Sequence, residues 1–239
     1  MKILITNDDG IFAPGMIPFA RWAQTIGDVT VIAPKVEQSG KSHGIELRKT
    51  FEVDEVDLGP GIRALSVDST PADCIRFAVL GLHEHFDLVL SGINKGYNMG
   101  QDMIYSGTMG AASEAAYQGL NAVAVSTDPD YYPRAVEHLD TVWDYFCRNR
   151  LLDMHSLYNV NIPPEAGDIH ITGQGGPYYS DQFPGEGGNL YKAHGRCIYE
   201  PGTDLSVDTH CVMNGHISIT PVSTDRTNRA VFGLLQHCR

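Results

Sequence analysis

The sequence has few cysteines, no long apolar run and a shortage of basic residues, and each shortage excludes a class of protein. Its five cysteines are scattered along 239 residues without a Cys-x-x-Cys pair, so we expect no disulfide framework and favour a reducing, cytoplasmic setting. No apolar run approaches the ~18–20 residues that a membrane-spanning helix needs. The N-terminal apolar run, Ile3 to Ile5, is also too short for a signal peptide.

Acidic residues outnumber basic ones by 29 to 17, which gives a formal net charge of -12. This charge opposes binding to a nucleic-acid polymer, whose backbone is also negative. A small phosphorylated ligand is still allowed, because a bound metal ion or a helix terminus can outweigh the global field. A hydrophobic fraction of 42% is enough for one large domain with a substantial core.

The first ten residues combine a strand with an acidic turn. Lys2 to Thr6 has the apolar, β-prone character of a short buried strand, and Asn7-Asp8-Asp9-Gly10 follows it directly. In an open α/β sheet, ligands bind just beyond the carboxyl ends of the strands. Two adjacent carboxylates repel each other unless a cation compensates. The stretch therefore suggests a metal site, and a solvated turn is the alternative interpretation.

Helical and strand patterns alternate along the chain, which predicts an α/β fold with a mostly parallel sheet. A helix over 14–26 separates the first strand from a second one at Asp28 to Ala33. Further strands are predicted at 45–58, 62–67, 87–91, 121–126, 157–162, 168–172 and 217–220, and further helices at 70–82, 106–116 and 133–150.

Polar loops follow two of these strands. The loop Pro34 to Gly44 contains Ser39, and the glycine-rich stretch Gly92 to Tyr105 contains Asn94. With Asp8 and Asp9 they offer only oxygen atoms, which suit Mg²⁺, Mn²⁺ or Ca²⁺ better than zinc. Ordinary loop hydrogen bonding is the alternative role for Ser39 and Asn94.

A second candidate site lies where a helix opens at Ser106-Gly107-Thr108. Free backbone amides, hydroxyl groups and the positive end of the helix dipole would bind phosphate there. A plain serine N-cap is the alternative. Lys35 stands where a P-loop ending at Gly40-Lys41-Ser42 would need a glycine, and no serine lies in a Gly-x-Ser-x-Gly elbow, so neither of these motifs is supported.

The pattern loosens between Gly173 and Gly215, a segment too long for an ordinary loop in a compact domain. We interpret it as an arm or hairpin that packs on another subunit. The chain is accordingly divided, within a single domain, into a core over 1–172 and an arm with the C-terminal segment over 173–239.

Several short motifs occur together in a fixed order: Ile-Thr-Asn-Asp-Asp-Gly at 5–10, Ala-Pro and Gln-Ser-Gly within 33–40, Ser-Gly-Ile-Asn-Lys-Gly-Tyr-Asn at 91–98, Tyr-Ser-Gly-Thr-Met-Gly-Ala-Ala at 105–112 and Asn-Val-Asn-Ile-Pro at 159–163. In this combination the chain resembles the survival protein SurE family of 5′/3′-nucleotidases. Ile217 to Pro221 extends the resemblance, whereas Gly173 stands where similar proteins often carry an arginine.

The resemblance implies a Rossmann-like three-layer core and a C-terminal β-rich arm exchanged between subunits of a dimer or tetramer. It implies one Mg²⁺ or Mn²⁺ ion per subunit on Asp8, Asp9, Ser39 and Asn94. Phosphate contacts are implied at Asn98, Ser106, Gly107 and Thr108. The implied reaction is hydrolysis of nucleoside 5′- and 3′-monophosphates, with short polyphosphate as a further substrate.

Two alternatives remain open at this point. The first is mechanistic: Asp8 stands at a strand end like the nucleophile of phosphatases that form an aspartyl-phosphate. Those enzymes carry Asp-x-Asp-x-Thr, whereas Asp8 is followed by Asp9-Gly10-Ile11-Phe12, so direct attack by water, with Asp8 or Asp9 as the catalytic carboxylate, is favoured. The second is functional: a metal-dependent nucleotide sensor would bind the same ligands without hydrolysing them.

Overall fold

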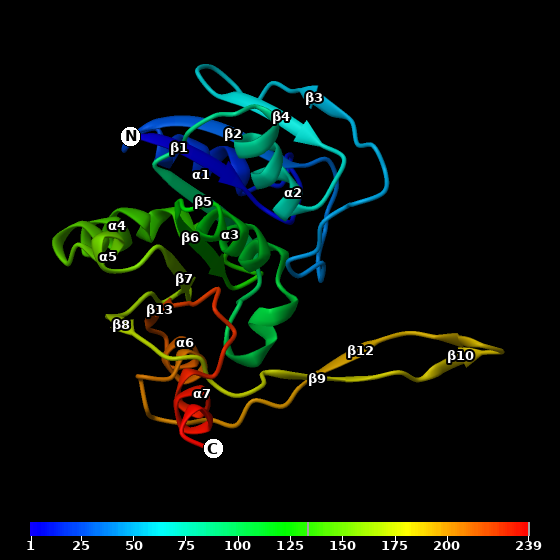
Figure 1. Cartoon of the computed structure of the whole chain (residues 1–239), viewed down its shortest axis with the longest axis vertical. Coiled ribbons are helices and arrows are strands. Elements are labelled where there is room, and N and C mark those ends of the chain that lie inside the picture. The colour runs from blue at the N-terminus through cyan, green and yellow to red at the C-terminus, as the bar shows by residue number, and fades with distance from the viewer. Residues whose placement is uncertain (133, 239) are drawn as a thin grey trace.

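The computed structural model describes residues 1–132 and 134–238 and contains a nine-stranded sheet in the order β3-β4-β2-β1-β5-β6-β7-β13-β8 (Figure 1). Neighbouring strands run parallel except for the pairs β3–β4 and β7–β13. This confirms the predicted α/β class with a mostly parallel sheet. The strands are β1 Lys2–Thr6, β2 Asp28–Pro34, β3 Val53–Glu55, β4 Arg63–Val67, β5 Leu88–Lys95, β6 Asn121–Thr127, β7 Leu157–Ile162, β8 Ile169–Ile171 and β13 Ile217–Pro221.

Helices cover both faces of the sheet and make three layers. The α-helices are α1 Met16–Ala23, α2 Pro71–Arg76, α3 Gly107–Tyr117, α4 Leu139–Arg148, α5 Leu151–Met154, α6 Asp208–Met213 and α7 Arg229–Gln236. Alternation along β1 assigns the layers: Ile3 and Ile5 pack in one apolar cluster with α1 and α4, whereas Leu4 packs in a second cluster with α2 and α3. Burying each such side chain contributes about 1.5–3 kcal/mol.

Capping residues mark the starts of α2 and α3. Thr70 accepts a hydrogen bond from the Asp73 N–H and Pro71 takes the first helical position of α2. Ser106 caps α3 by accepting from the Met109 N–H at 3.0 Å. Helix α3 carries glycine and alanine on its buried side, so it lies close to β5 and β6.

Four predicted elements are markedly shorter or broken. The helix predicted over 14–26 is formed over Met16–Ala23 only. Only Val53–Glu55 of the strand predicted over 45–58 is formed, because β3 lies at the sheet edge and the preceding residues form a loop in which Leu47 is exposed. The helix predicted over 70–82 continues from α2 into a π-helical turn, η1 Phe77–Gly81. The helix predicted over 133–150 is split into the 3₁₀ segment η3 Arg134–His138 and α4, and Pro133 lies outside the described residues.

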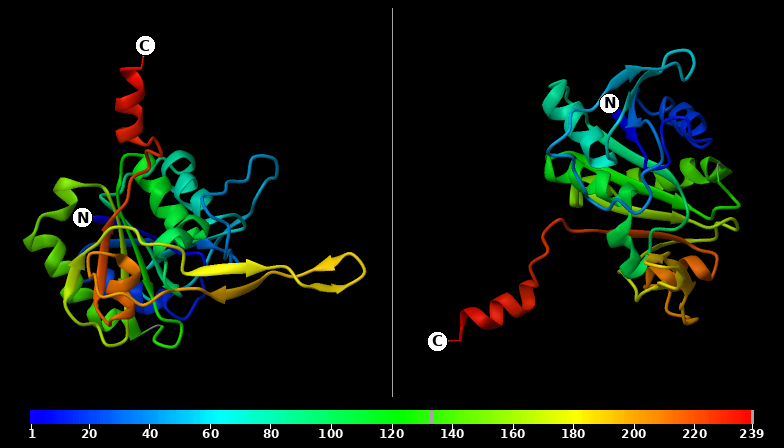
Figure 2. Two further views of the ribbon diagram at one scale, coloured as in Figure 1. Left: turned by 90° about the horizontal axis from the view of Figure 1, so that it is seen from below. Right: turned by 90° about the vertical axis from the view of Figure 1, so that its right-hand side faces the viewer.

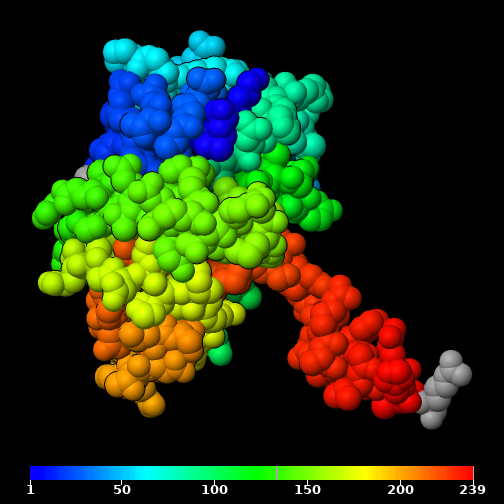
Figure 3. Space-filling view, turned by 90° about the vertical axis from the view of Figure 1, so that its left-hand side faces the viewer, coloured from blue at the N-terminus to red at the C-terminus, as the bar shows by residue number. Residues whose placement is uncertain are grey.

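The segment predicted as an arm is a long hairpin that extends away from the body (Figures 1 and 2). Its paired strands are β9 Tyr179–Gln182 with β12 His194–Cys197, and β10 Gly185–Gly187 with β11 Leu190–Tyr191. The short helix α6 beyond the hairpin and the C-terminal helix α7 were not predicted, and α7 stands apart from the body (Figure 3). None of the helices in the described ranges has the length and apolar character needed to cross a bilayer.

Candidate active site

Strand β1 ends in a tight turn that places two carboxylates at the carboxyl edge of the sheet. The Asn7 side chain closes the turn: its amide nitrogen donates to the Gly10 carbonyl at 2.9 Å, and its Oδ1 atom accepts from the Gly10 N–H at 3.2 Å. Gly10 adopts a φ of 99°, which favours glycine. Asp8 and Asp9 lie in a bend and not in extended strand, which is the condition for both to reach one ion.

The buried carboxylate of Asp8 packs against the start of α3. Its Oδ1 atom accepts a hydrogen bond from the Thr108 hydroxyl at 2.6 Å. Burial raises the pKa of Asp8 above its ordinary value, although hydrogen bonds from Thr108 and Gly107 oppose this effect. A Cβ atom at Gly107 would lie 2.8 Å from the Asp8 Cβ. The helix start and the acidic turn therefore touch each other.

Asp9 is less buried than Asp8 and faces the end of β5. Its Oδ2 atom accepts from the Lys95 N–H at 3.2 Å. Burial raises the pKa of Asp9 to about 6, and the negative charges of Asp8 and Glu37 add to the effect. Two adjacent carboxylates with raised pKa values therefore lie side by side at this edge of the sheet.

Ser39 lies in the loop after β2, and this loop is fastened to the acidic turn. The Gln38 N–H donates to the Asp8 carbonyl at 2.7 Å, which holds the residue before Ser39 against β1. The Ser39 hydroxyl donates to Glu37 Oε1 at 2.7 Å. A lone pair of the hydroxyl oxygen remains available to a cation.

Asn94 lies near the end of β5, on the strand next to β1. Its side-chain amide nitrogen donates to the Gly96 carbonyl at 2.7 Å, which leaves the amide oxygen as the group that can bind a cation. Strands β1 and β5 flank the point where the strand order reverses, the usual place for ligands in such sheets. Asp9 contacts the residue next to Asn94, because its carboxylate accepts from the Lys95 N–H.

These residues fit a hard divalent cation. The set offers two carboxylates, a hydroxyl and an amide oxygen, which are the atoms that such a cation prefers. The pKa of Asp9 is raised first by burial and then by the negative charge of Asp8 beside it. Within residues 1–132 and 134–238, no three His, Cys, Asp or Glu side chains gather in a metal-binding arrangement, so the proposed shell depends on Ser39 and Asn94.

The predicted phosphate contacts fall into two places. Ser106, Gly107 and Thr108 form the start of α3 beside Asp8, so they adjoin the acidic turn. Asn98 lies instead in a buried polar network, where its side-chain nitrogen donates to Ser126 Oγ at 2.8 Å and its N–H donates to Asn161 Oδ1 at 2.9 Å. Its role as a phosphate contact stays a prediction.

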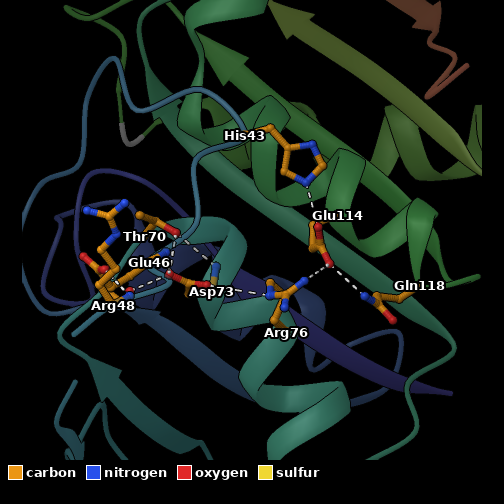
Figure 4. Close-up of polar contacts among 9 residues, drawn as sticks. His43, Glu46, Arg48, Thr70, Asp73, Arg76, Glu114 and Gln118 are labelled. Atoms are coloured by element: carbon orange, nitrogen blue, oxygen red, sulfur yellow. Dashed lines mark hydrogen bonds and ion pairs between the residues drawn. The ribbon is translucent and has the colours of Figure 1, made fainter. Parts of the chain in front are cut away.

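The loop that contains Ser39 also contacts α3 through His43, and Figure 4 shows the residues involved. His43 Nε2 lies 2.7 Å from Glu114 Oε2, and Glu114 is only 4% exposed. Arg76 lies 3.5 Å from the other oxygen of Glu114, which also accepts from Gln118. Burial opposes ionisation of Glu114, but the bonds from His43 and Gln118 and the charge of Arg76 outweigh it and lower the pKa.

The survival protein SurE family model matches residues 3–181, which include every predicted site residue. The chain belongs to the survival protein SurE family. Among its relatives, a protein named 5′-nucleotidase SurE from Legionella pneumophila is 35% identical over 251 residues, covering 99% of this chain and 96% of the relative. A 5′-nucleotidase SurE from Clostridium beijerinckii is 36% identical over 248 residues, covering 97% and 96%. The crystal structure of the Sure protein from Aquifex aeolicus superimposes with a TM-score of 0.79 at 28% identity, covering 100% of this chain and 99% of that one.

This SurE-family chain contains supporting residues that the sequence reasoning missed. Asn159 and Asn161 on β7 are fully buried, and their side-chain nitrogens donate to the Asn98 carbonyl at 2.6 and 2.9 Å. They fix the loop between β5 and η2 (Gly100–Tyr105), a 3₁₀ segment. Two asparagines in an otherwise apolar strand were the available signal, because buried amides must find partners. Glu114 was missed because its partner His43 is 71 residues away.

Proposed function

We propose that the protein is a metal-dependent phosphomonoesterase that hydrolyses nucleoside 5′- and 3′-monophosphates to nucleoside and phosphate. The observation that supports this proposal is the contact between the acidic turn and the start of α3, since it would place a bound cation next to a bound phosphate. The names of the relatives, 5′-nucleotidase SurE, support the same substrate class.

Asp8, Asp9, Ser39 and Asn94 would hold one Mg²⁺ or Mn²⁺ ion. The ion would lower the pKa of a bound water and neutralise charge on the phosphoryl group. The Thr108 hydroxyl fixes one oxygen of Asp8, so this carboxylate is held in one orientation. The Ser106 hydroxyl accepts from the Met109 N–H and keeps its own proton, so it would donate to a phosphate oxygen at the start of α3, beside Gly107 and Thr108.

Asp9 is the better candidate to orient the water and accept its proton. A single bond from the Lys95 N–H engages Asp9, whereas the side chain and backbone of Thr108 and the backbone of Gly107 engage Asp8. We therefore favour direct attack by water over an aspartyl-phosphate on Asp8. Trapping of phosphate on Asp8 during turnover would overturn this preference.

The test is phosphate release from a panel of nucleoside 5′- and 3′-monophosphates, with Mn²⁺, with Mg²⁺ and with a chelator. We expect release that requires the metal and that is lost in Asp9→Asn. Binding of the same nucleotides without release on any of them would support the sensor alternative instead. Short polyphosphate belongs in the panel as a second, weaker substrate class.

A further inference from the structure

A groove of about 1090 Å³ lies between η2 and the base of the hairpin arm, outside the residues assigned to metal or phosphate. One wall is formed by Gln101, Asp102 and Tyr105 of η2, and the other by Tyr179, Ser180 and Asp181 of the arm. Gly40 lies at its edge, directly after Ser39, and Tyr105 directly precedes Ser106. The groove therefore begins at residues that are adjacent in sequence to Ser39, a proposed metal ligand, and to Ser106, a proposed phosphate contact.

Hydrogen bonds hold the two walls together. The carboxylate of Asp102 accepts from the N–H groups of Tyr178 and Tyr179, at 3.0 and 2.7 Å. Buried Asp208 accepts from the N–H groups of Gly100 and Gly175, at 2.9 and 2.8 Å. A Cβ atom at Gly100 would lie 2.1 Å from the Gly176 carbonyl oxygen, which shows how closely the walls approach. Both walls are thus joined by hydrogen bonds within this chain.

Aromatic faces are accessible on both walls. Tyr105 is 64% exposed and Tyr179 is 53% exposed. The Tyr179 ring is supported by the Tyr178 ring at a centroid distance of 4.9 Å, and Tyr178 in turn contacts Tyr199. Exposed, supported aromatic rings beside polar groups are suited to stacking on a nucleobase.

The charge of the groove discriminates between ligands. Its described lining includes two carboxylates, Asp102 and Asp181, and no lysine, arginine or histidine. Carboxylates accept hydrogen bonds from ribose hydroxyls but repel a second phosphate group. The lining thus suits a neutral nucleoside attached to a phosphate that is bound elsewhere.

We propose that this groove binds the nucleoside part of the substrate, with the base stacked on Tyr179 and the ribose next to Asp181. The assignment rests on the proposed function and deepens it, because it makes nucleoside monophosphates better substrates than polyphosphate or small phosphate esters. Specificity then resides in the arm and η2, and not in the residues that bind metal and phosphate.

Tyr179→Ala tests the stacking. We expect KM for adenosine 5′-monophosphate to rise about tenfold, while kcat/KM for ribose 5-phosphate, which lacks the base, stays unchanged. Tyr179→Phe should behave like the unmodified protein because it keeps the ring. Tyr117→Ala is the control, since Tyr117 is an exposed tyrosine at the last residue of α3 and does not line the groove.

Asp181→Asn tests the charge. It should lower KM for tripolyphosphate several-fold, whereas Glu186→Gln on β10 should not. Equal effects of Tyr179→Ala on both phosphate esters, or no effect on either, would overturn the assignment. If the unmodified protein hydrolyses neither ester, the proposed function fails. Calorimetric titration with adenosine then tests separately whether the groove binds a nucleoside. Saturable binding that is lost in Tyr179→Ala supports the assignment, and absence of binding refutes it.

Discussion

At the scale of single residues, Gly107 determines how closely Asp8 approaches α3. An added Cβ atom would lie 2.8 Å from the Asp8 Cβ and 2.9 Å from its Oδ2 atom. Asp8 is tied to Thr108 and lies at the end of a buried strand, so it has little freedom to move away. The absence of a side chain at position 107 is therefore part of the site geometry.

Gly107→Ala should lower kcat/KM by ~10–100-fold, because a shift of about 1 Å in a ligand group is enough for such a loss. Phosphate release and Mn²⁺ titration measure the effect. Gly233→Ala in exposed helix α7 is the control, since nothing lies within 4 Å of its added Cβ. Equal activity in the two variants would show that the close packing of Gly107 against Asp8 is not needed for activity.

Asp9 makes the free energy of unfolding of the metal-free protein depend on pH. Its pKa is about 6 in the fold against an ordinary value of 3.8, so the folded state binds this proton more tightly than the unfolded state. The stabilisation by protonation is complete below pH 3.8 and is lost as the pH rises through 6. At neutral pH the ionised Asp9 carboxylate lowers the free energy of unfolding by roughly 2–3 kcal/mol.

Asp9→Asn should therefore raise the melting temperature of the metal-free protein at pH 7.5 by about 5 °C, and this gain should vanish near pH 4. Thermal unfolding followed by circular dichroism measures it. The same variant should lose the stabilisation that Mn²⁺ gives to the unmodified protein. Asp144→Asn, at an exposed position on α4, is the control and should leave both quantities unchanged.

At the scale of elements, the loop after β2 depends on contacts with α3 and η2. The Ser42 N–H donates to the Tyr105 carbonyl and its hydroxyl to the Ile104 carbonyl, at 3.0 and 2.7 Å. His43 adds its contact with Glu114. Because the pKa of Glu114 is lowered, its ionised form stabilises the fold above pH 4.5 and this contribution is lost as the pH falls further.

His43→Ala should weaken Mn²⁺ binding by about tenfold, as expected for a residue that positions a ligand from outside the coordination shell. Calorimetric titration in the absence of substrate measures it. His43→Gln keeps a hydrogen-bond donor and should recover part of the affinity. His85→Ala is the control, because the His85 side chain is 80% exposed. An unchanged dissociation constant for Mn²⁺ in His43→Ala would show that the contact between His43 and Glu114 does not affect metal binding.

Sequence periodicity predicted the buried strands of the sheet well, because strands such as β1, β6 and β7 are short, largely buried and mostly apolar. It failed at 45–58, where β-like residues lie in a loop whose course is set by distant contacts such as that between the Glu46 N–H and Asp73. Sequence periodicity also could not predict the contact between His43 and Glu114, because no local pattern links these two residues. The acidic turn was predictable since its residues are adjacent.

At the scale of the whole molecule, two projecting segments carry exposed apolar side chains. The arm exposes Phe183, Leu190 and Tyr191, and α7 exposes Val231, Phe232, Leu234 and Leu235. None of the described residues of α7 is buried. Apolar side chains gathered on a projecting segment mark a surface for association.

Light scattering after size exclusion should therefore give a mass of at least twice the 26.1 kDa of one chain. Leu234→Asp combined with Leu235→Asp should reduce this mass and leave the circular dichroism spectrum unchanged. Leu80→Asp, at an exposed apolar position on the body, should retain the assembly. A monomeric unmodified protein would contradict the prediction.

The contacts of Asp208 also constrain the order in which the protein is built. This residue joins Gly100, which is 108 positions earlier, to Gly175, and closing so long a loop is slow relative to forming local contacts. During synthesis on the ribosome, the strands from β1 to β7 emerge before α6 does. A nascent chain can thus form its central sheet while the groove beside the site still lacks a support, and we expect full activity only after residue 208 has left the exit tunnel.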